Sequence, residues 1–191
     1  MNNTPTLGFA LCGSFCTFRK AVNVIRYLTE KGYNIIPIMS FNAYNTDTRF
    51  GKAQDFISEI EEITGNKIIS TITEAEPIGP KKLLDALVIE PCTGNTIAKL
   101  AAGIADTPVT LAAKSHLRNA RPLIIAISTN DALSGAAKNI GALMNCKNIF
   151  FVPYRQDDCN NKPTSIVADF SQTENTIISA LNYKQIQPII I

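Results

Sequence analysis

Short apolar segments alternate with segments of helical periodicity along most of the chain, and this alternation is the feature that most restricts its fold. The first unit is the clearest. Residues 6–12 are apolar and stop at Gly13-Ser14, and residues 34–39 are again apolar. Between them, apolar side chains recur at spacings of three and four, at Phe18, Ala21, Val22, Ile25 and Leu28. This spacing predicts a helix between two strands, and such a unit places the strands in parallel with a right-handed crossover.

The same alternation continues to the C-terminus. Pro37 indicates an edge or distorted position for the second strand. The last helix is expected to begin at a capping Ser171, and the polar residues 40–50 and 153–165 are expected to be loops. Further strands are predicted at 85–90, 122–127 and 148–152, and helices at 51–64, 97–105, 108–114, 132–144 and 171–181. The chain is therefore predicted to be an α/β protein, a three-layer Rossmann-like or flavodoxin-like doubly wound parallel sheet of about five or six strands, in one domain over residues 1–191.

The composition argues against several classes of protein. The formal net charge is +2 and no block of basic residues occurs, which argues against nucleic acid as the main partner. No apolar run reaches the roughly 18 residues of a transmembrane helix, and the polar N-terminus lacks the basic start of a secretory signal. Five scattered cysteines without CxxC spacing and a single histidine do not suit a disulfide framework or a structural zinc site. We therefore expect a cytoplasmic protein with no metal and no membrane partner.

Small polar residues follow four of the predicted strands. Open parallel sheets bind ligands at the carboxyl ends of their strands, so these residues are expected to converge on one rim of the sheet. The candidate cofactor-binding residues are Gly13, Ser14, Thr17, Ser40, Asn42, Cys92, Thr93, Asn95, Thr96, Ser128, Thr129 and Asn130. No catalytic residue is assigned.

The loop at Gly13-Ser14 suits a phosphate, because glycine lets backbone amides approach an anion and the following helix offers free N–H groups. It matches neither a Walker loop nor a GxGxxG fingerprint. A tight turn with a helix cap is an equal alternative. The uncharged residues 93–96 suit a neutral, planar ligand such as a flavin ring, although a helix cap alone also explains them.

Several other polar residues have a simple structural explanation. His116 is expected to be a surface or subunit-contact histidine, and Lys114, Arg118 and Arg121 a solvated helix face rather than a site for an acidic substrate. Cys16 and Cys92 lack a visible base, so packing or cofactor contact is favoured over nucleophilic catalysis.

Three segments resemble a known family. Gly13-Ser14-Phe15, Ser40-x-x-Ala43 and the stretch from Pro91 to Asp106 are similar to the flavoprotein family of homo-oligomeric FMN-containing cysteine decarboxylases and prenyltransferases. The resemblance implies FMN as a cofactor and a homo-oligomer, a trimer or a multiple of trimers, with the flavin site between subunits. By position it places Gly13, Ser14 and Ser40 at the FMN phosphate, and Thr93, Asn95 and Thr96 near the flavin ring and its ribityl chain.

The chain also departs from the family pattern. Ser128-Thr129-Asn130 replaces the Pro-x-Met-Asn segment and keeps only its asparagine. The decarboxylases use a histidine on the helix after the second strand, and residues 41–66 contain none, so cysteine decarboxylation is not expected. Residues 152–158, 162–169 and 184–188 resemble one member of the family more closely. That resemblance implies a separate dehydrogenase-like partner, with NADP on that partner, and a small dicarboxylate substrate.

Three functions remain open at this point. The leading hypothesis is a redox subunit that works together with its partner. The alternatives are a non-catalytic scaffold or substrate-holding subunit with a vestigial flavin site, and an FMN-dependent decarboxylase of another substrate. Unranked candidates to bind the carboxylates of the substrate are Arg49, Lys52, Arg118, Arg121 and Arg155. The apolar tail at 189–191 is expected to pack on a partner chain.

Overall fold

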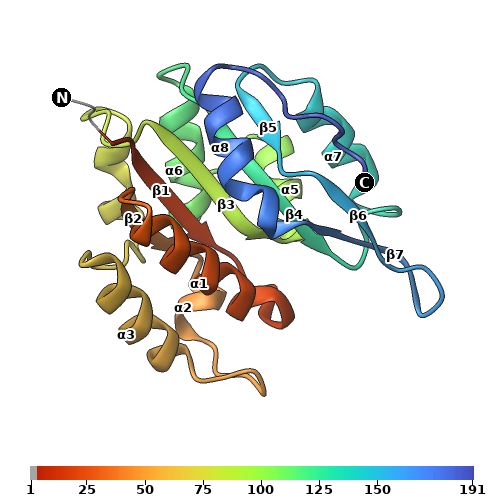
Figure 1. Cartoon of the computed structure of the whole chain (residues 1–191), viewed down its shortest axis with the longest axis horizontal. Helices are drawn as coiled ribbons and strands as arrows, with labels where there is room; N and C mark the ends of the chain where they lie inside the picture. The colour runs from red at the N-terminus through yellow and green to blue at the C-terminus, as the bar shows by residue number, and fades with distance from the viewer. Residues whose placement is uncertain (1–3) are drawn as a thin grey trace.

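The computed structural model describes residues 4–191, and one sheet of seven strands runs through it (Figure 1). Five strands are parallel and lie in the order β2-β1-β3-β4-β5. This is the flavodoxin-like order, so the predicted fold class is confirmed. The parallel strands are β1 (Thr6–Leu11), β2 (Asn34–Met39), β3 (Ala86–Cys92), β4 (Leu123–Thr129) and β5 (Ile149–Phe151).

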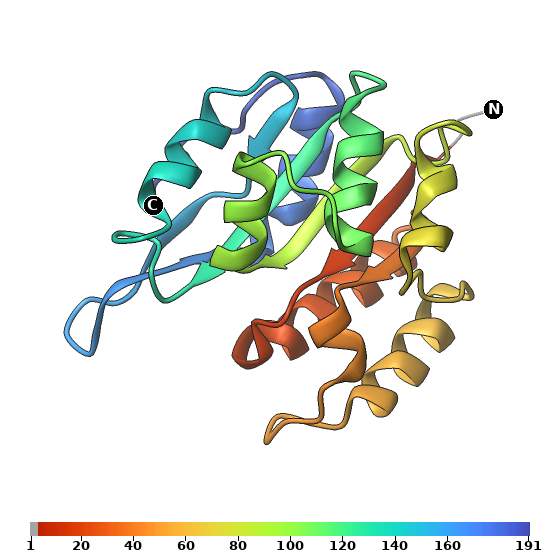
Figure 2. The same ribbon diagram turned by 180° about the vertical axis from the view of Figure 1, so that it is seen from behind.

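Helices cover both faces of the sheet and complete three layers. The longest, α1 (Phe15–Glu30), lies with α8 (Thr173–Leu181) over the face turned to the viewer in Figure 1. The opposite face, seen in Figure 2, carries α5 (Gly94–Ala101) and α6 (Pro108–Leu117). The remaining helices are α2 (Phe41–Asn45), α3 (Ala53–Thr64), α4 (Ile72–Ala75), α7 (Ala137–Met144) and the 3₁₀ turns Glu76–Ile78 and Phe170–Gln172. None of the helices between residues 4 and 191 combines the length and apolar character that a membrane span requires.

The buried strands follow from the sequence pattern. All seven residues of β3 are buried, as expected for a central strand covered on both faces. This strand does not end before Pro91 but continues to Cys92, with an irregular register against β4 between Ile89 and Cys92. The edge position inferred from Pro37 is correct, because β2 pairs with β1 on one side and forms only an isolated bridge, Ile38 to Ile69, on the other side within residues 4–191.

Several local predictions are wrong. Residues 132–136 are turns, so the helix predicted at 132–144 begins only at Ala137, and the helix predicted at 97–105 runs over Gly94–Ala101. Residues 40–50 are not all loop, because the Ser40 hydroxyl accepts a hydrogen bond from the Ala43 amide (3.3 Å) and starts the short helix α2. Ser171 does not cap the last helix. It donates its own amide to the Asp169 carboxylate (3.1 Å) at the start of a 3₁₀ turn, and α8 begins two residues later at Thr173.

The largest correction concerns residues 153–165, which form most of a β-hairpin instead of a loop. Its strands β6 (Tyr154–Asp158) and β7 (Lys162–Ala168) are antiparallel. β7 pairs with the end of β4, through Ser128↔Val167 and Thr129↔Ile166, whereas the beginning of β4 pairs with β5. The hairpin extends past the core, so most of its side chains are exposed and polar, and the apolar signal of a strand is missing.

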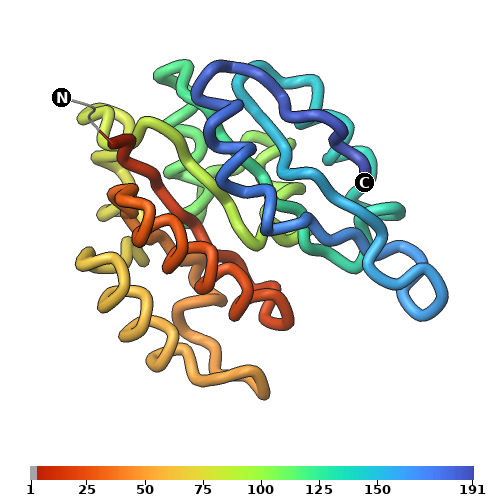
Figure 3. Tube along the Cα trace, viewed as in Figure 1, coloured from red at the N-terminus to blue at the C-terminus, as the bar shows by residue number. Residues whose placement is uncertain are grey.

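The C-terminal tail is held by its own chain. The Tyr154 amide donates to the Ile189 carbonyl (3.0 Å), and the Ile191 amide donates to the Tyr154 carbonyl (3.1 Å). Figure 3 traces this tail back alongside β6. Ile190 nevertheless remains 68% exposed. The backbone of the tail is thus occupied within its own chain, while apolar side chains stay at the surface.

A carboxylic acid lies inside the core. Glu90 on β3 is completely buried, and its Oε2 accepts a hydrogen bond from the Thr173 hydroxyl at the start of α8 (2.6 Å). Its Oε1 has no hydrogen-bond partner among residues 4–191. Burial raises the pKa of Glu90 to about 8, so the side chain is mostly protonated at neutral pH.

Glu90→Gln is expected to make stability less sensitive to pH. The folded-state pKa of about 8 lies above the ordinary 4.5, so wild type must bind a proton on folding between these values and loses stability as pH rises through them. Glutamine has the shape of the protonated acid and needs no proton. The variant should match wild type near about pH 5 and exceed it by roughly 3–4 kcal/mol near about pH 8 in urea unfolding followed by circular dichroism.

The exposed Glu62→Gln serves as the control, because it removes a carboxylate from the surface of α3. A difference between Glu90→Gln and wild type that stays constant across this pH range would show that Glu90 does not take up a proton on folding.

Candidate functional site

The site begins where the chain leaves β1 and enters α1. The Ser14 amide donates to the Cys12 carbonyl (2.8 Å), which closes a tight turn over Gly13. Ser14 occupies the N-cap position of α1, yet no side chain caps the helix. The first-turn residues Phe15, Cys16 and Thr17 line a cleft at this point. The Thr17 amide donates to the Ser14 carbonyl (3.1 Å), so the amides of Phe15 and Cys16 are the ones suited to bind an anion at the start of this 16-residue helix.

Three hydroxyl groups form the floor beside this turn. Ser14 Oγ and Ser128 Oγ share a hydrogen bond of 2.8 Å, and Thr17 Oγ1 lies 3.0 Å from Ser128 Oγ. Thr17 also donates to Ser14 Oγ (3.1 Å). These contacts join the first loop to the end of β4 across more than 110 residues of sequence. The hydroxyl cluster therefore fixes two strand ends against each other and presents polar oxygens to the cleft.

A second set of polar groups follows β3. The Thr93 hydroxyl accepts from the Thr96 amide (3.4 Å) and caps α5, while the Thr96 hydroxyl donates to Cys12 Sγ (3.2 Å). Burial raises the pKa of the Cys12 thiol to about 11, and it raises the pKa of Cys92 well above the ordinary value. Both thiols are therefore protonated near neutral pH and are not nucleophiles.

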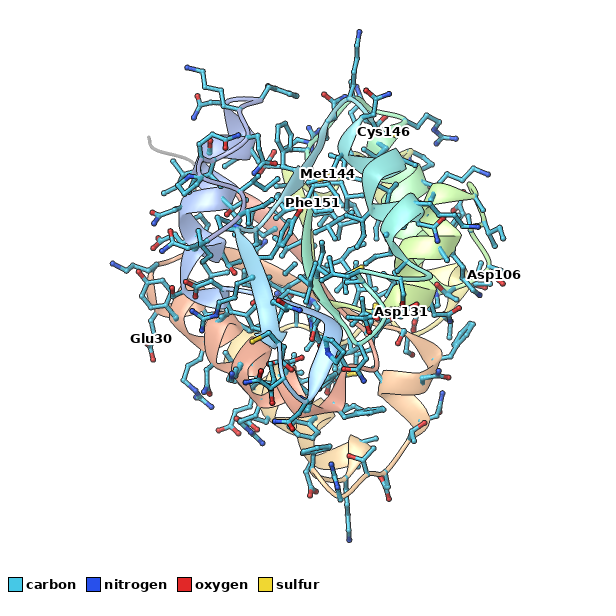
Figure 4. The ribbon with its side chains drawn as sticks, turned by 90° about the vertical axis from the view of Figure 1, so that its right-hand side faces the viewer. Glu30, Asp106, Asp131, Met144, Cys146 and Phe151 are labelled. Atoms are coloured by element: carbon cyan, nitrogen blue, oxygen red, sulfur yellow. The ribbon has the colours of Figure 1, made fainter. Side chains whose placement is uncertain are left out.

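Gly94 allows the β3 and β4 loops to approach closely. Thr129 Oγ1 donates to Asp131 Oδ1 (2.6 Å), and a Cβ atom on Gly94 would lie 2.6 Å from that carboxylate oxygen and 2.8 Å from the Thr129 hydroxyl. Figure 4 labels Asp131 on the loop that follows β4. This loop is joined to the hairpin, because the Leu133 amide donates to the Thr164 carbonyl (3.0 Å).

These elements enclose two adjoining clefts of about 690 and 340 Å³, which share Gly13 and Thr93. Ligand sites commonly have volumes of this order. Besides the shared pair, the first cleft contains the predicted residues Ser14, Thr17, Ser128, Thr129 and Asn130. The second contains Ser40, Asn42, Asn95 and Thr96. Of the twelve candidates, Cys92 alone lines neither cleft, because its side chain is completely buried, so its predicted cofactor contact is not supported.

The first cleft is rich in positive charge, and the sequence predicts this feature only in part. Arg49 and Arg155 are among the five unranked cations, whereas Lys20 and Lys162 are additional to them. One carboxylate, Asp157, also lines this cleft and pairs with Lys162 (2.8 Å). Lys162 was missed because its strand was predicted to be a loop. Lys20 was missed because the sequence shows that it lies on the polar face of a helix but not that this face borders a cleft.

The other basic candidates lie elsewhere. Arg121 donates to the carbonyls of Lys82 and Leu84, at the opposite end of the sheet. His116 is buried, not on the surface as predicted, and its Nε2 contacts the Pro122 carbonyl (3.0 Å). Burial lowers the pKa of His116 to about 4, so the ring is neutral near pH 7. Arg118 and Lys52 line neither cleft.

Comparison with known proteins gives consistent matches over nearly the whole chain. A family model described as Flavoprotein matches residues 1–181. The chain is 45% identical over 185 residues to the B subunit of dipicolinate synthase from Bacillus subtilis (strain 168), covering 97% of this chain and 92% of that protein. The crystal structure of the same B subunit from Bacillus halodurans C superposes with a TM-score of 0.91 at 41% identity, covering 100% of this chain and 98% of that one.

A more distant structure shares the fold. The FMN-dependent cysteine decarboxylase SpaF superposes with a TM-score of 0.63 at 24% identity, covering 92% of this chain and 97% of that one. The arrangement of sheet and helices is thus common to proteins whose sequences have diverged widely.

Gly94→Ala is expected to lower stability by about 1 kcal/mol, because the new methyl group would overlap the ends of the Thr129 and Asp131 side chains and break the hydrogen bond between them. Gly141→Ala is the matched control. A Cβ atom there meets nothing within 4 Å, and alanine favours the helix α7. Chemical unfolding should show a loss for the first variant and no loss for the second. Equal stability of both variants would contradict the close approach at Gly94.

Proposed function

The chain belongs to the Flavoprotein family, and we propose that it is a flavin-binding subunit of dipicolinate synthase. It works with a dehydrogenase-like partner, the A component of that enzyme, during sporulation. The observation that carries the proposal is the 45% identity to the B subunit of dipicolinate synthase over 97% of the chain. The 41% identity to the crystallised protein of the same name supports it over the full length.

The proposed reaction is the oxidation of a dihydrodipicolinate precursor to dipicolinate. The precursor loses a hydride from a ring carbon and a proton from the ring, which removes two electrons and two protons and leaves an aromatic pyridine dicarboxylate. A bound flavin supplies a two-electron acceptor, and a nicotinamide such as NADP on the dehydrogenase-like partner is the alternative acceptor. This chain contributes the pocket that positions the substrate and excludes water.

The residues present fit a flavin. The second cleft offers hydroxyl and amide groups from Ser40, Asn42, Asn95 and Thr96, which can donate to and accept from the edges of a neutral ring system. No carboxylate lines this cleft in the described part of the chain, and its basic residue Lys99 is paired with Asp106. Next to it, the uncapped start of α1 and the hydroxyl cluster offer donors to a phosphate. A flavin across Gly13 and Thr93 would use both features.

The alternatives have less support. Decarboxylation by the family mechanism lacks its histidine, since the single histidine of the chain is buried against Pro122 at the far end of the sheet. A pure scaffold with a vestigial flavin site explains the fold but not the cleft cations that have no ion-pair partner within residues 4–191. A substrate-holding subunit without flavin would keep these cations, and FMN binding distinguishes it from the proposed function. We further propose a homo-oligomer, a trimer or a multiple of trimers, in which neighbouring subunits complete the flavin site, and light scattering tests it.

Dipicolinate formation should require both proteins of the synthase. Assays of this chain without its partner, of the partner without this chain, and of the mixture, each with and without FMN, are expected to show product only in the mixture and more of it with FMN. Purified protein should show a flavin absorbance band, or should gain one when FMN is added. A colourless protein that does not bind FMN, in an active mixture, would favour the scaffold alternative.

Asn95→Ala is expected to weaken FMN binding several-fold, because it removes one hydrogen-bonding side chain from the second cleft. The matched control is Asn23→Ala, another exposed helical asparagine, which lines neither cleft. Equilibrium dialysis with FMN measures both, and thermal unfolding should be unchanged for both. Equal affinity of the two variants would exclude Asn95 as a flavin contact.

A further inference from the structure

We propose that Arg49 and Arg155 bind the two carboxylates of the substrate and make the first cleft selective for a small dicarboxylate, an inference that rests on the function proposed above. Both side chains line the cleft beside the hydroxyl cluster and the uncapped start of α1. They are separated by more than 100 residues of sequence. Arg49 comes from the connection between α2 and α3, and Arg155 comes from β6.

The charge balance of the cleft favours a doubly anionic ligand. Four basic side chains and one carboxylate line it, and that carboxylate, Asp157, is already paired with Lys162. Within residues 4–191, no carboxylate lies within ion-pair distance of Arg49, Arg155 or Lys20. A concave surface with uncompensated cations attracts small anions. The guanidinium group of arginine can donate two parallel N–H bonds to the two oxygens of a carboxylate, which the ammonium group of lysine cannot do.

The register of the sheet explains how Arg155 reaches the cleft. Ser128 of the hydroxyl cluster pairs with Val167 on β7, and Val167 pairs with Arg155 on β6. Residues in register on neighbouring strands point to the same face, and two strand spacings amount to roughly 10 Å. The arginine side chain therefore starts on the same side as Ser128, with Val167 between them, so a small molecule that reaches both would lie over Val167.

Arg49 is held by a tight turn on the other side. Thr48 and Gly51 exchange backbone hydrogen bonds of 3.0 and 3.1 Å, and the Phe50 amide donates to the Thr48 hydroxyl (3.1 Å). The guanidinium group lies 4.9 Å from the centre of the Phe50 ring. Phe50 also lines the cleft, although 46% of it is exposed. An aromatic surface next to a cation suits a planar ring that carries carboxylates.

The structure also separates these two arginines from the other cations proposed for this role. Arg118, Arg121 and Lys52 line neither cleft. Lys52 is close to Arg49 in sequence, yet it only precedes α3 as its N-cap residue and makes no side-chain capping bond. It therefore offers a control of equal charge in almost the same place.

The test uses the complex of this chain and its dehydrogenase-like partner with the dihydrodipicolinate precursor. Arg155→Gln and Arg49→Gln should each raise KM roughly 10- to 100-fold, as expected for a lost charged hydrogen bond, while kcat stays within about threefold.

Inhibition by pyridine-2,6-dicarboxylate should weaken equally in these variants, so that it no longer inhibits more strongly than pyridine-2-carboxylate. Arg155→Lys should recover part of the loss. Lys52→Gln should leave KM and inhibition unchanged, and FMN binding should be unchanged in all four variants.

Three outcomes would overturn the proposal. A similar rise in KM for Lys52→Gln would mean that the net positive charge of this region attracts the substrate, without direct contacts from the two arginines. Weaker FMN binding by the two arginine variants, with unchanged dicarboxylate inhibition, would assign these cations to the flavin phosphate. An active complex whose KM is unaffected by either substitution would refute the role of the arginines and leave the proposed function standing.

Failure of the proposed function gives a different result. In that case the wild-type complex would form no dipicolinate at all. Calorimetry with pyridine-2,6-dicarboxylate then decides the inference separately: arginine-dependent binding to the full chain would support a dicarboxylate site, and no binding would overturn it.

Discussion

The pairing of β7 with the last residues of β4 is the interaction on which the site depends. It ties Val167 to Ser128 and Ile166 to Thr129, just where β4 leaves the core. Ser128 in turn contacts the hydroxyls of Ser14 and Thr17. The last residues of β4 therefore hold both the first loop and the hairpin in place. The hairpin supplies one wall of the larger cleft, so this pairing holds that wall in place.

The two clefts differ in chemistry. Under the proposed function, the larger cleft would take the carboxylates of the substrate beside the flavin phosphate, and the smaller cleft would take the flavin ring. The smaller cleft presents mainly hydroxyls and amides, and its one described basic lining residue, Lys99, is paired with Asp106, which suits an extended, mostly neutral ring system. The larger cleft presents guanidinium and ammonium groups above a polar floor, which suits a compact anion. The buried thiols of Cys12 and Cys92 have raised pKa values and add no reactivity. A ring system and a small acid held side by side would suit the proposed hydride transfer.

The sequence predicted the parallel strands of the core better than the hairpin and the basic residues that border the larger cleft. β2 was predicted at residues 34–39 and spans them, because its apolar run is bounded by polar residues. Eleven of the twelve candidate residues line the clefts, since parallel topology alone gathers strand ends. The hairpin was missed because only some of its residues are buried. Arg155 could not be ranked without that hairpin, since its place follows from the pairing of strands distant in sequence. His116 was wrongly predicted to lie at the surface, because the sequence around a single polar residue does not show whether its side chain is buried.

The divided edge of β4 has a consequence for how the molecule moves. Residues 123–125 of β4 pair with the buried strand β5. Ser128 and Thr129 pair with β7 of the hairpin, which is mostly exposed to solvent. Backbone amides along a single strand should therefore exchange with solvent at very different rates. Opening at the hairpin end of β4 is therefore expected to cost less free energy than opening at its β5 end, so the mouth of the pocket should loosen before the interior does.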